Sequence, residues 1–272
     1  ISSARSEAAM DARPEFWGAH HSERFADPSI IAAYRYRPPY PEALIERLVA
    51  LITGEPRAVL DVGCGPGNLA RPLLRHVARV DAVDVSPGMI AMGKTLPGGN
   101  DPRLHWFVGS AEETPLRPPY ALVTAGASLH WMDWAVALPR FADALTPNGV
   151  LAIVGVDEAD EPWTPAIRAI IPRYSTNPDF APLDLIGELE RRGLFEKRGE
   201  YITEPQPLVR SVDDFIEWFH SMSSFSRDRM TPEAVASFDA ALRDAVAPYV
   251  RDRLLDTHVI GRMTWGRPLR KQ

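Results

Sequence analysis

The stretch that decides the fold reads Ala58-Val59-Leu60-Asp61-Val62-Gly63-Cys64-Gly65-Pro66-Gly67, and it continues into Asn68-Leu69-Ala70-Arg71-Pro72-Leu73-Leu74. The apolar run predicts a strand, the glycines predict a tight turn, and the residues after them predict a helix. Glycine has no side chain, so backbone N–H groups can approach a ligand closely at the N-terminus of that helix. Unpaired donors and the helix dipole favour a polar group there. The stretch therefore predicts a seat for a small molecule.

Two acidic residues indicate which molecule. Asp61 ends the strand just before the first glycine, and the glycine spacing is G-x-G-x-G, whereas the dinucleotide fingerprint is G-x-G-x-x-G. An anion at this point would repel a pyrophosphate but suits a cationic amino acid group. A second apolar run ends at Asp84, about 20 residues beyond the glycines, which is the offset at which a carboxylate reaches ribose hydroxyls. Together these features describe a ligand that joins an adenosyl group to an amino acid.

At this point the sequence resembles the class I S-adenosylmethionine-dependent methyltransferases. Residues 58–67 resemble the first motif of that family, residues 83–90 its second strand and following turn, and residues 107–115 its adenine-contacting segment. Residues 34–41 and 128–134 are similar to the branch that includes trans-aconitate methyltransferases. The resemblance covers residues from about 30 to 156 well, and the rest of the chain only by general plan.

The resemblance implies that the chain binds S-adenosyl-L-methionine. The residues that it assigns to the cofactor are Tyr34, Arg37, Asp61, Gly63, Cys64, Gly65, Gly67, Asp84, Val85, Met89, Ser110, Ala111, Glu112 and Ala127. Many family members carry Asp in place of Ser110, so the backbone of Ala111 is expected to serve the adenine instead. Simpler roles remain open: Asp61 as a turn cap, Cys64 as a small packed residue, and Arg37 as a donor to a loop carbonyl.

Composition limits the class of protein. The chain has 272 residues, a net charge of -6 and 45% apolar residues, which favours neither disorder nor a nucleic-acid surface. No apolar run approaches the roughly 20 residues of a membrane span, and the polar start is unlike a secretory signal. We expect a cytoplasmic monomer or homodimer that binds no membrane, nucleic acid or metal. The adjacent His20 and His21 point in different directions, which argues against a metal pair.

The pattern of apolar residues predicts an α/β fold. Expected strands lie near residues 58–62, 80–85, 104–108, 120–125 and 150–156, and expected helices near 44–52, 67–77, 87–95 and 133–145. Strands that alternate with helices indicate a parallel sheet covered on both faces. The resemblance implies a Rossmann-like, mostly parallel seven-stranded sheet of the class I methyltransferase type.

The region after residue 157 predicts a helix at 183–192, a strand at 195–203, helices at 212–222 and 232–246, and a strand at 258–264. The family closes its sheet with an antiparallel strand pair, so the last two helices would interrupt that pair as a helical lid over the pocket. The expected parts are a cap at 1–33, the cofactor-binding core at 34–204, the lid at 205–256 and a closing strand at 257–272.

The acceptor side carries several candidates. His130 follows the fourth strand and is the candidate general base, although a loop-shaping histidine is the open alternative. Trp131 and Trp134 are candidates for the pocket wall, or for the core; His220 and Arg227 on or beside the lid helix could meet the acceptor, or be solvated. The favoured function is methyl transfer to an oxygen of a small molecule, a carboxylate or a hydroxyl. The alternatives are a cofactor-binding regulatory protein without transferase activity and, less favoured by the glycine spacing, an NAD-dependent oxidoreductase.

Overall fold

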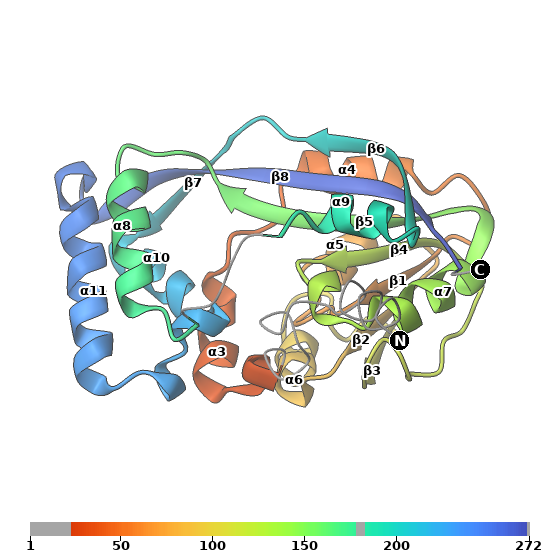
Figure 1. Cartoon of the computed structure of the whole chain (residues 1–272), viewed down its shortest axis with the longest axis horizontal. Helices are drawn as coiled ribbons and strands as arrows, with labels where there is room; N and C mark the ends of the chain where they lie inside the picture. Colours follow the sequence, from red (N-terminus) through yellow and green to blue (C-terminus); the bar gives the residue numbers. More distant parts are fainter. Residues whose placement is uncertain (1–22, 178–182, 271–272) are drawn as a thin grey trace, which may run out of the picture.

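The computed structural model describes residues 23–177 and 183–270. These residues form an α/β fold in which one mixed β-sheet has helices on both faces (Figure 1). The strands are β1 (Ala58–Val62), β2 (Arg79–Asp84), β3 (Leu104–Val108), β4 (Tyr120–Gly126), β5 (Leu145–Glu158), β6 (Phe195–Ile202), β7 (Gln206–Ser211) and β8 (Leu254–Pro268). Their order is β3-β2-β1-β4-β5-β8-β6, and β7 also pairs with β8.

Pairing within the sheet is mostly parallel. β3, β2, β1, β4 and β5 run parallel to their neighbours, whereas β8 is antiparallel to β5, β6 and β7. The expected Rossmann-like fold class is confirmed, but the sheet has eight strands where seven were expected. β8 is 15 residues long, so its second half pairs with β6 and its first half is left to pair with the additional strand β7.

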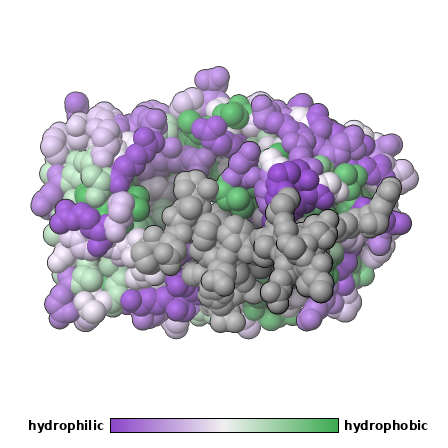
Figure 2. Space-filling view, in the orientation of Figure 1, coloured by the Kyte–Doolittle hydropathy of each residue, from purple (hydrophilic) through white to green (hydrophobic). Residues whose placement is uncertain are grey.

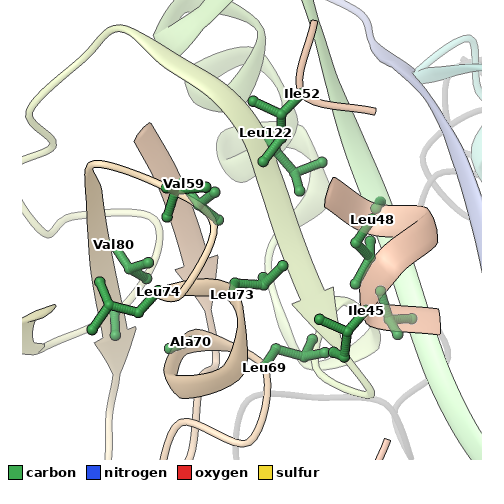
Figure 3. Packing of buried hydrophobic residues seen from close by; sticks show 14 of the residues in the cluster. Ile45, Leu48, Ile52, Val59, Leu69, Ala70, Leu73, Leu74, Val80 and Leu122 are labelled. Atoms are coloured by element: carbon green, nitrogen blue, oxygen red, sulfur yellow. The ribbon is translucent and has the colours of Figure 1, made fainter. Parts of the chain in front are cut away.

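Helices cover the two faces separately. On one face, α4 (Glu42–Ala50) and α5 (Ala70–Leu73) pack on β1, β2 and β4, with Ile45, Leu73 and Leu122 among the contacting residues (Figure 3). On the other face lie α7 (Trp134–Ala144) and α9 (Leu185–Arg191). α5 is shorter than the expected helix at 67–77, because Gly67 adopts a φ of +77° that a helix cannot contain.

A third apolar cluster lies in the part of the chain that was expected to form a lid, which we call the lid region or lid below. α8 (Thr164–Tyr174), α10 (Val212–His220) and α11 (Pro232–Val246) gather around Phe215, Phe219 and Phe238 at one end of β8 (Figure 1). The expected helices at 212–222 and 232–246 are present, whereas α8 was not predicted. The expected lid at 205–256 begins with β7, which belongs to the sheet, and it relies on α8 from outside that range.

The N-terminal segment lies between the lid and the core. Its described part contains a 3-10 helix (η2, Glu23–Ala26), α3 (Pro28–Ala33) and a second 3-10 helix (η3, Tyr34–Tyr36). α3 contacts both α10 and α6 (Pro87–Thr95). Residues 1–22, with His20 and His21, are outside the described part of the expected cap.

Polar residues dominate the face drawn in Figure 2, with small apolar areas between them. Among the described residues, none of the helices combines the length and the apolar character needed to cross a membrane.

Candidate cofactor and acceptor site

The glycine turn after β1 is held in a conformation that only glycine adopts easily. Gly63 and Gly65 have φ of +63° and +54°. A Cβ on Gly63 would lie 2.4 Å from Cβ of Ser128, and one on Gly65 would lie 3.3 Å from the hydroxyl of Tyr34. The turn is therefore packed between the loop after β4 and the N-terminal segment, and side chains at these two positions would close the space.

Asp84 is fixed beside this turn by the backbone. One carboxylate oxygen accepts from the N–H of Gly65 at 2.7 Å, and the other accepts from the N–H of Ser86 at 2.8 Å. Ser86 also caps α6 by accepting from the N–H of Met89, as its sequence position suggests. Burial raises the pKa of Asp84. Each carboxylate oxygen still has accepting capacity for a hydroxyl of a ligand.

Asp61 is buried and only half satisfied. Its side chain is 1% exposed; Oδ1 accepts from the Thr124 hydroxyl at 2.8 Å, and Oδ2 has no hydrogen-bond partner. Burial raises the pKa of Asp61 to about 7, against the opposing effect of the Thr124 hydrogen bond. A buried acceptor without a donor is costly, so this oxygen is suited to a cationic ligand group.

Two cavities meet at the carboxyl edge of the sheet. A smaller one of about 70 Å³ is lined by Asp61, Cys64 and Tyr40, and a larger one of about 530 Å³ by Asp84, Ser110 and Trp131. Both are lined by the same group of residues: Tyr34, Arg37, Gly63, Gly126 and Ala127. The shared residues make the two cavities neighbours, and together they form the candidate site at the edge where open α/β sheets bind ligands.

The structure brings together nearly all of the residues expected at the cofactor. Those on the larger cavity are Tyr34, Arg37, Gly63, Gly65, Asp84, Val85, Met89, Ser110, Ala111, Glu112 and Ala127; Asp61 and Cys64 are on the smaller one. Gly67 lines neither cavity. A Cβ there would lie 2.6 Å from the ring of Trp106, so the glycine serves close packing, and its expected contact with the cofactor stays a prediction.

Cys64 and Ala127 add two details of the wall. Cys64 is 8% exposed, and burial raises the pKa of its thiol well above the ordinary value, which fits a packed residue and not a nucleophile. Ala127 has a φ of +50°, an unusual conformation for a residue other than glycine, and its N–H donates to the carbonyl of Val154. The strained residue therefore lies where the two cavities join.

Arg37 forms the expected bond to a loop carbonyl and also lies on the walls of the cavities. It lines both cavities, and it donates from Nε to Oγ of Ser221 at 3.0 Å and from Nη2 to the carbonyl of Ser221 at 2.8 Å. Its guanidinium lies over the ring of Tyr34 at 4.4 Å from the centroid. Arg37 thus connects the N-terminal segment, the site and the end of the lid helix α10.

The two tryptophans of the segment after β4 lie in different surroundings, one at a cavity and one in the core. Trp131 lines the larger cavity and meets Phe25 edge-on at 5.9 Å, whereas Trp134 is 3% exposed and donates from its indole to the carbonyl of Leu129. Trp134 is therefore a core residue. His130 has its ring 4.5 Å from that of Trp131 and is not among the residues lining either cavity, so its role as general base stays a prediction.

The two lid candidates do not reach the cavities. His220 is fully buried, with Nδ1 at 2.7 Å from the carbonyl oxygen of Phe225 and Nε2 at 2.6 Å from Asp239. Arg227 forms a two-pronged pair with Glu217, both contacts at 2.7 Å. Both side chains make their contacts within the lid region, and their expected contact with the acceptor stays a prediction.

Other lining residues were missed from the sequence. Phe25 and Met132 line the larger cavity, and Tyr40, Val156 and Trp218 line the smaller one. Trp218 lies on the amphipathic helix α10, where its spacing looks the same as that of a core residue. No group of three or more His, Cys, Asp or Glu side chains that could hold a metal is found within residues 23–177 and 183–270.

Comparison with known proteins supports the interpretation of these cavities as the site of a methyltransferase domain. A family model described as a methyltransferase domain matches residues 59–149. A trans-aconitate 2-methyltransferase of Streptomyces avermitilis is 34% identical over 116 residues, covering 40% of this chain and 42% of the relative. Another, of Methylobacterium nodulans, is 32% identical over 169 residues, covering 61% and 58% respectively. This chain spans about half the length of the curated relatives that it matches first.

A solved structure shows the same fold. The putative type II methyltransferase of Anaeromyxobacter dehalogenans superposes with a TM-score of 0.59 at 24% identity, covering 86% of this chain and 99% of the other. The glycine turn with its two carboxylates, the sheet order and the matched domain agree with one another. The chain therefore contains a methyltransferase domain, and it resembles the trans-aconitate methyltransferase branch of the class I S-adenosylmethionine-dependent methyltransferases.

Proposed function

We propose that this protein transfers a methyl group from S-adenosylmethionine to an oxygen atom of a small molecule. The observation that carries the proposal is the pair of fixed carboxylates at the glycine turn, with Oδ2 of Asp61 buried and without a donor. A ligand with an ammonium group at one end and ribose hydroxyls further along fits both carboxylates. A pyrophosphate would meet Asp61 with like charge.

The lining residues divide into parts that suit such a ligand. Asp61 faces an ammonium group, and Asp84 is placed to accept from ribose hydroxyls. Ser110 and Ala111 lie on the adenine side, and Arg37 offers a cation to the cofactor's carboxylate. Tyr34 covers the glycine turn near Gly65. These residues bind and orient the cofactor, which is what a displacement at carbon chiefly needs from an enzyme.

The chemistry asks little of the protein beyond position. When bound, S-adenosylmethionine supplies an electrophilic methyl carbon. The chain's own residues hold the acceptor oxygen in line with that carbon and keep water out. A carboxylate acceptor is already deprotonated, whereas a hydroxyl gains from a base, for which His130 is the candidate. The names of the relatives, which specify trans-aconitate, favour a carboxylate oxygen.

Formation of S-adenosylhomocysteine tests the proposal. The purified chain is incubated with S-adenosylmethionine and a panel of small carboxylates and phenols, and the product is quantified against a Gly65→Val variant. In that variant a branched side chain stands where the turn has a φ of +54°. We expect acceptor-dependent product only with the natural sequence. Binding of the cofactor with no turnover across the panel would favour the regulatory alternative, and no binding at all would exclude both.

A further inference from the structure

The charges around the two cavities are unbalanced. Among the residues that the structure describes, those with carboxylates on the cavity walls are Asp61, Asp84, Glu112, Glu113 and Asp133, and the basic lining residue is Arg37. A cavity with walls of one sign concentrates ligands of the opposite sign and repels those of its own. This wall suits the cationic cofactor and is unfavourable for an acceptor with several negative charges.

The N–H groups of the Arg37 guanidinium are already partly engaged in hydrogen bonds. Two of its nitrogens donate to Ser221, and its guanidinium lies over the ring of Tyr34. Arg37 is also the cation that we assign to the carboxylate of the cofactor. Arg37 therefore has few N–H groups left to bind an acceptor that carries two or three carboxylates.

A second buried arginine is close by but does not reach the cavities. Arg210 on β7 is 7% exposed and forms an ion pair with Glu158, and its guanidinium lies 5.0 Å from the ring centroid of Trp218. It lines neither cavity. Its acidic partner is Glu158, its guanidinium nitrogens have no hydrogen-bond partner among the described residues, and it packs against the indole of Trp218 from the side away from the cavity. Arg210 therefore acts on the site through Trp218.

The apolar part of the site is aromatic. Phe25 and Trp131 form an edge-on pair on the larger cavity, and Tyr40 and Trp218 line the smaller one. Aromatic side chains offer broad, flat, apolar faces that pack well against a ring or a short branched chain. The acceptor's body is thus expected to be apolar and flat.

The aromatic residue contributed by the lid lies outside the part of the chain that matches the family. The methyltransferase domain model covers residues 59–149, which include the glycine turn and Asp84 but neither Phe25 nor Trp218. The match therefore supports the shared cofactor and does not extend to these acceptor-side residues. The acceptor named for the relatives need not be that of this chain.

From these observations we infer that the acceptor is a small molecule with an apolar, ring-sized body and no more than one negative charge, and so is not a polycarboxylate. The inference rests on the proposed methyl transfer. In that step the acceptor oxygen forms a bond to the methyl carbon while the carbon–sulfur bond breaks, and its electron pair remains on sulfur. A single carboxylate reacts without losing a proton, whereas a phenol passes its proton to a base or to water.

The first experiment separates the cofactor from the acceptor. Calorimetry with S-adenosylhomocysteine establishes whether the cofactor site works; no binding would mean that the proposed function fails, and this inference with it. On the protein saturated with S-adenosylhomocysteine, affinities are then measured for benzoate, 4-methylphenol and trans-aconitate by saturation-transfer NMR and tryptophan fluorescence. We expect one of the aromatic probes to bind at least tenfold more tightly than trans-aconitate.

The results have a clear reading. Binding of trans-aconitate as tight as that of the best aromatic probe, or failure of both aromatic probes to bind the saturated protein, would overturn the inference and leave methyl transfer standing. Trp218→Ala should weaken the aromatic probe at least tenfold more than it weakens S-adenosylhomocysteine, and Trp218→Phe should restore most of the loss. Equal affinities for the probe in all three proteins would also contradict the inference.

Discussion

Asp61 is the residue at which stability and function oppose each other. Its carboxylate is buried, and burial raises its pKa from 3.8 to about 7 against the opposing effects of the Thr124 hydroxyl and the backbone N–H of Ala70. The folded state therefore binds a proton more tightly than the unfolded state. This contribution to stability is full below pH 4 and is lost as the pH rises through 7.

Asp61→Asn should consequently stabilise the cofactor-free protein at pH 8. Asparagine retains an oxygen for the Thr124 hydroxyl and removes the buried charge, so we expect the free energy of unfolding to rise by about 1 to 3 kcal/mol. At pH 4 the two proteins should differ much less, because the wild-type carboxyl is protonated there. Urea unfolding at the two pH values measures both numbers; a variant less stable than the wild type at pH 8 would contradict the argument.

The same carboxylate should make cofactor affinity depend on pH. An ammonium group prefers ionised Asp61, so a group with a pKa of about 7 should give about fivefold tighter binding at pH 7 than at pH 6. In Asp61→Asn this dependence should largely disappear and affinity should be lower at both pH values. Calorimetric titration with S-adenosylmethionine checks this, and equal slopes in the two proteins would remove Asp61 from the ammonium site.

A substitution of Asp84 tests how the ribose of the cofactor is bound. Asp84→Asn keeps one oxygen for a backbone N–H but loses the charge, so we expect cofactor binding to weaken by about 1.5 to 3 kcal/mol. The melting temperature should also fall somewhat, because the carboxylate holds the N–H groups of both Gly65 and Ser86. Asp160→Asn is the control, since that side chain is 79% exposed and distant in role. Unchanged affinity in Asp84→Asn would mean that the ribose is bound elsewhere.

At the scale of elements, the lid helix α10 is fixed from inside by His220. Both ring nitrogens face acceptor atoms, the carbonyl of Phe225 and the carboxylate of Asp239. His220→Ala removes the imidazole from between these two groups and opens a gap beside Phe238, while Asp239 keeps its ion pair with Arg227, so the free energy of unfolding should fall by about 1 to 3 kcal/mol.

Arg243→Ala is the matched control for His220→Ala within the same lid. Arg243 is 54% exposed and pairs with Asp213, and a surface pair contributes about 0 to 1 kcal/mol. Denaturant unfolding compares the two variants. A loss in acceptor turnover by His220→Ala, without a loss of stability, would instead return this residue to the site.

Local signals in the sequence predicted the elements whose starts are marked by a capping residue and a proline. α11 starts at Pro232 behind the capping residue Thr231, and its range of 232–246 matches the prediction because a cap, a proline and helical spacing all agree. β7 could not be predicted in the same way. It contains Pro207 and mostly exposed residues, and it exists as a strand only because β8 lies beside it.

The residues of the candidate site also differ in how well local sequence signals predict them. The glycines and Asp84 are dictated by backbone geometry within one strand-turn-helix unit, so their sequence pattern reveals them. Trp218 and Phe25 reach the site through contacts between segments far apart in the chain. The sequence shows them as ordinary apolar residues of a helix or turn, and it presents His220 as a candidate for the acceptor or as a solvated residue.

At the scale of the whole molecule, the N-terminal segment ties the lid to the cofactor site. Asp27 pairs with Arg229 at 2.6 and 2.9 Å and accepts from the Ser226 hydroxyl, and the N–H of Ser29 donates to Asp228. Arg37 joins the same connection at Ser221. A ligand that orders Arg37 should therefore also order residues 221–229, although these residues line neither cavity.

Hydrogen exchange of the whole chain tests this connection. Saturating S-adenosylhomocysteine should slow exchange in peptides that cover the lid loop 221–229 as well as in those that cover the glycine turn, because local opening of the loop must break the bonds to Arg37. In Arg37→Met, studied at saturation, protection of the turn should remain and protection of the loop should be lost. Arg35→Met, an exposed neighbour on the same segment, should behave as the wild type. If the loop of Arg37→Met were still protected, the coupling would run through the Asp27–Arg229 pair instead, and Asp27→Asn should then abolish it.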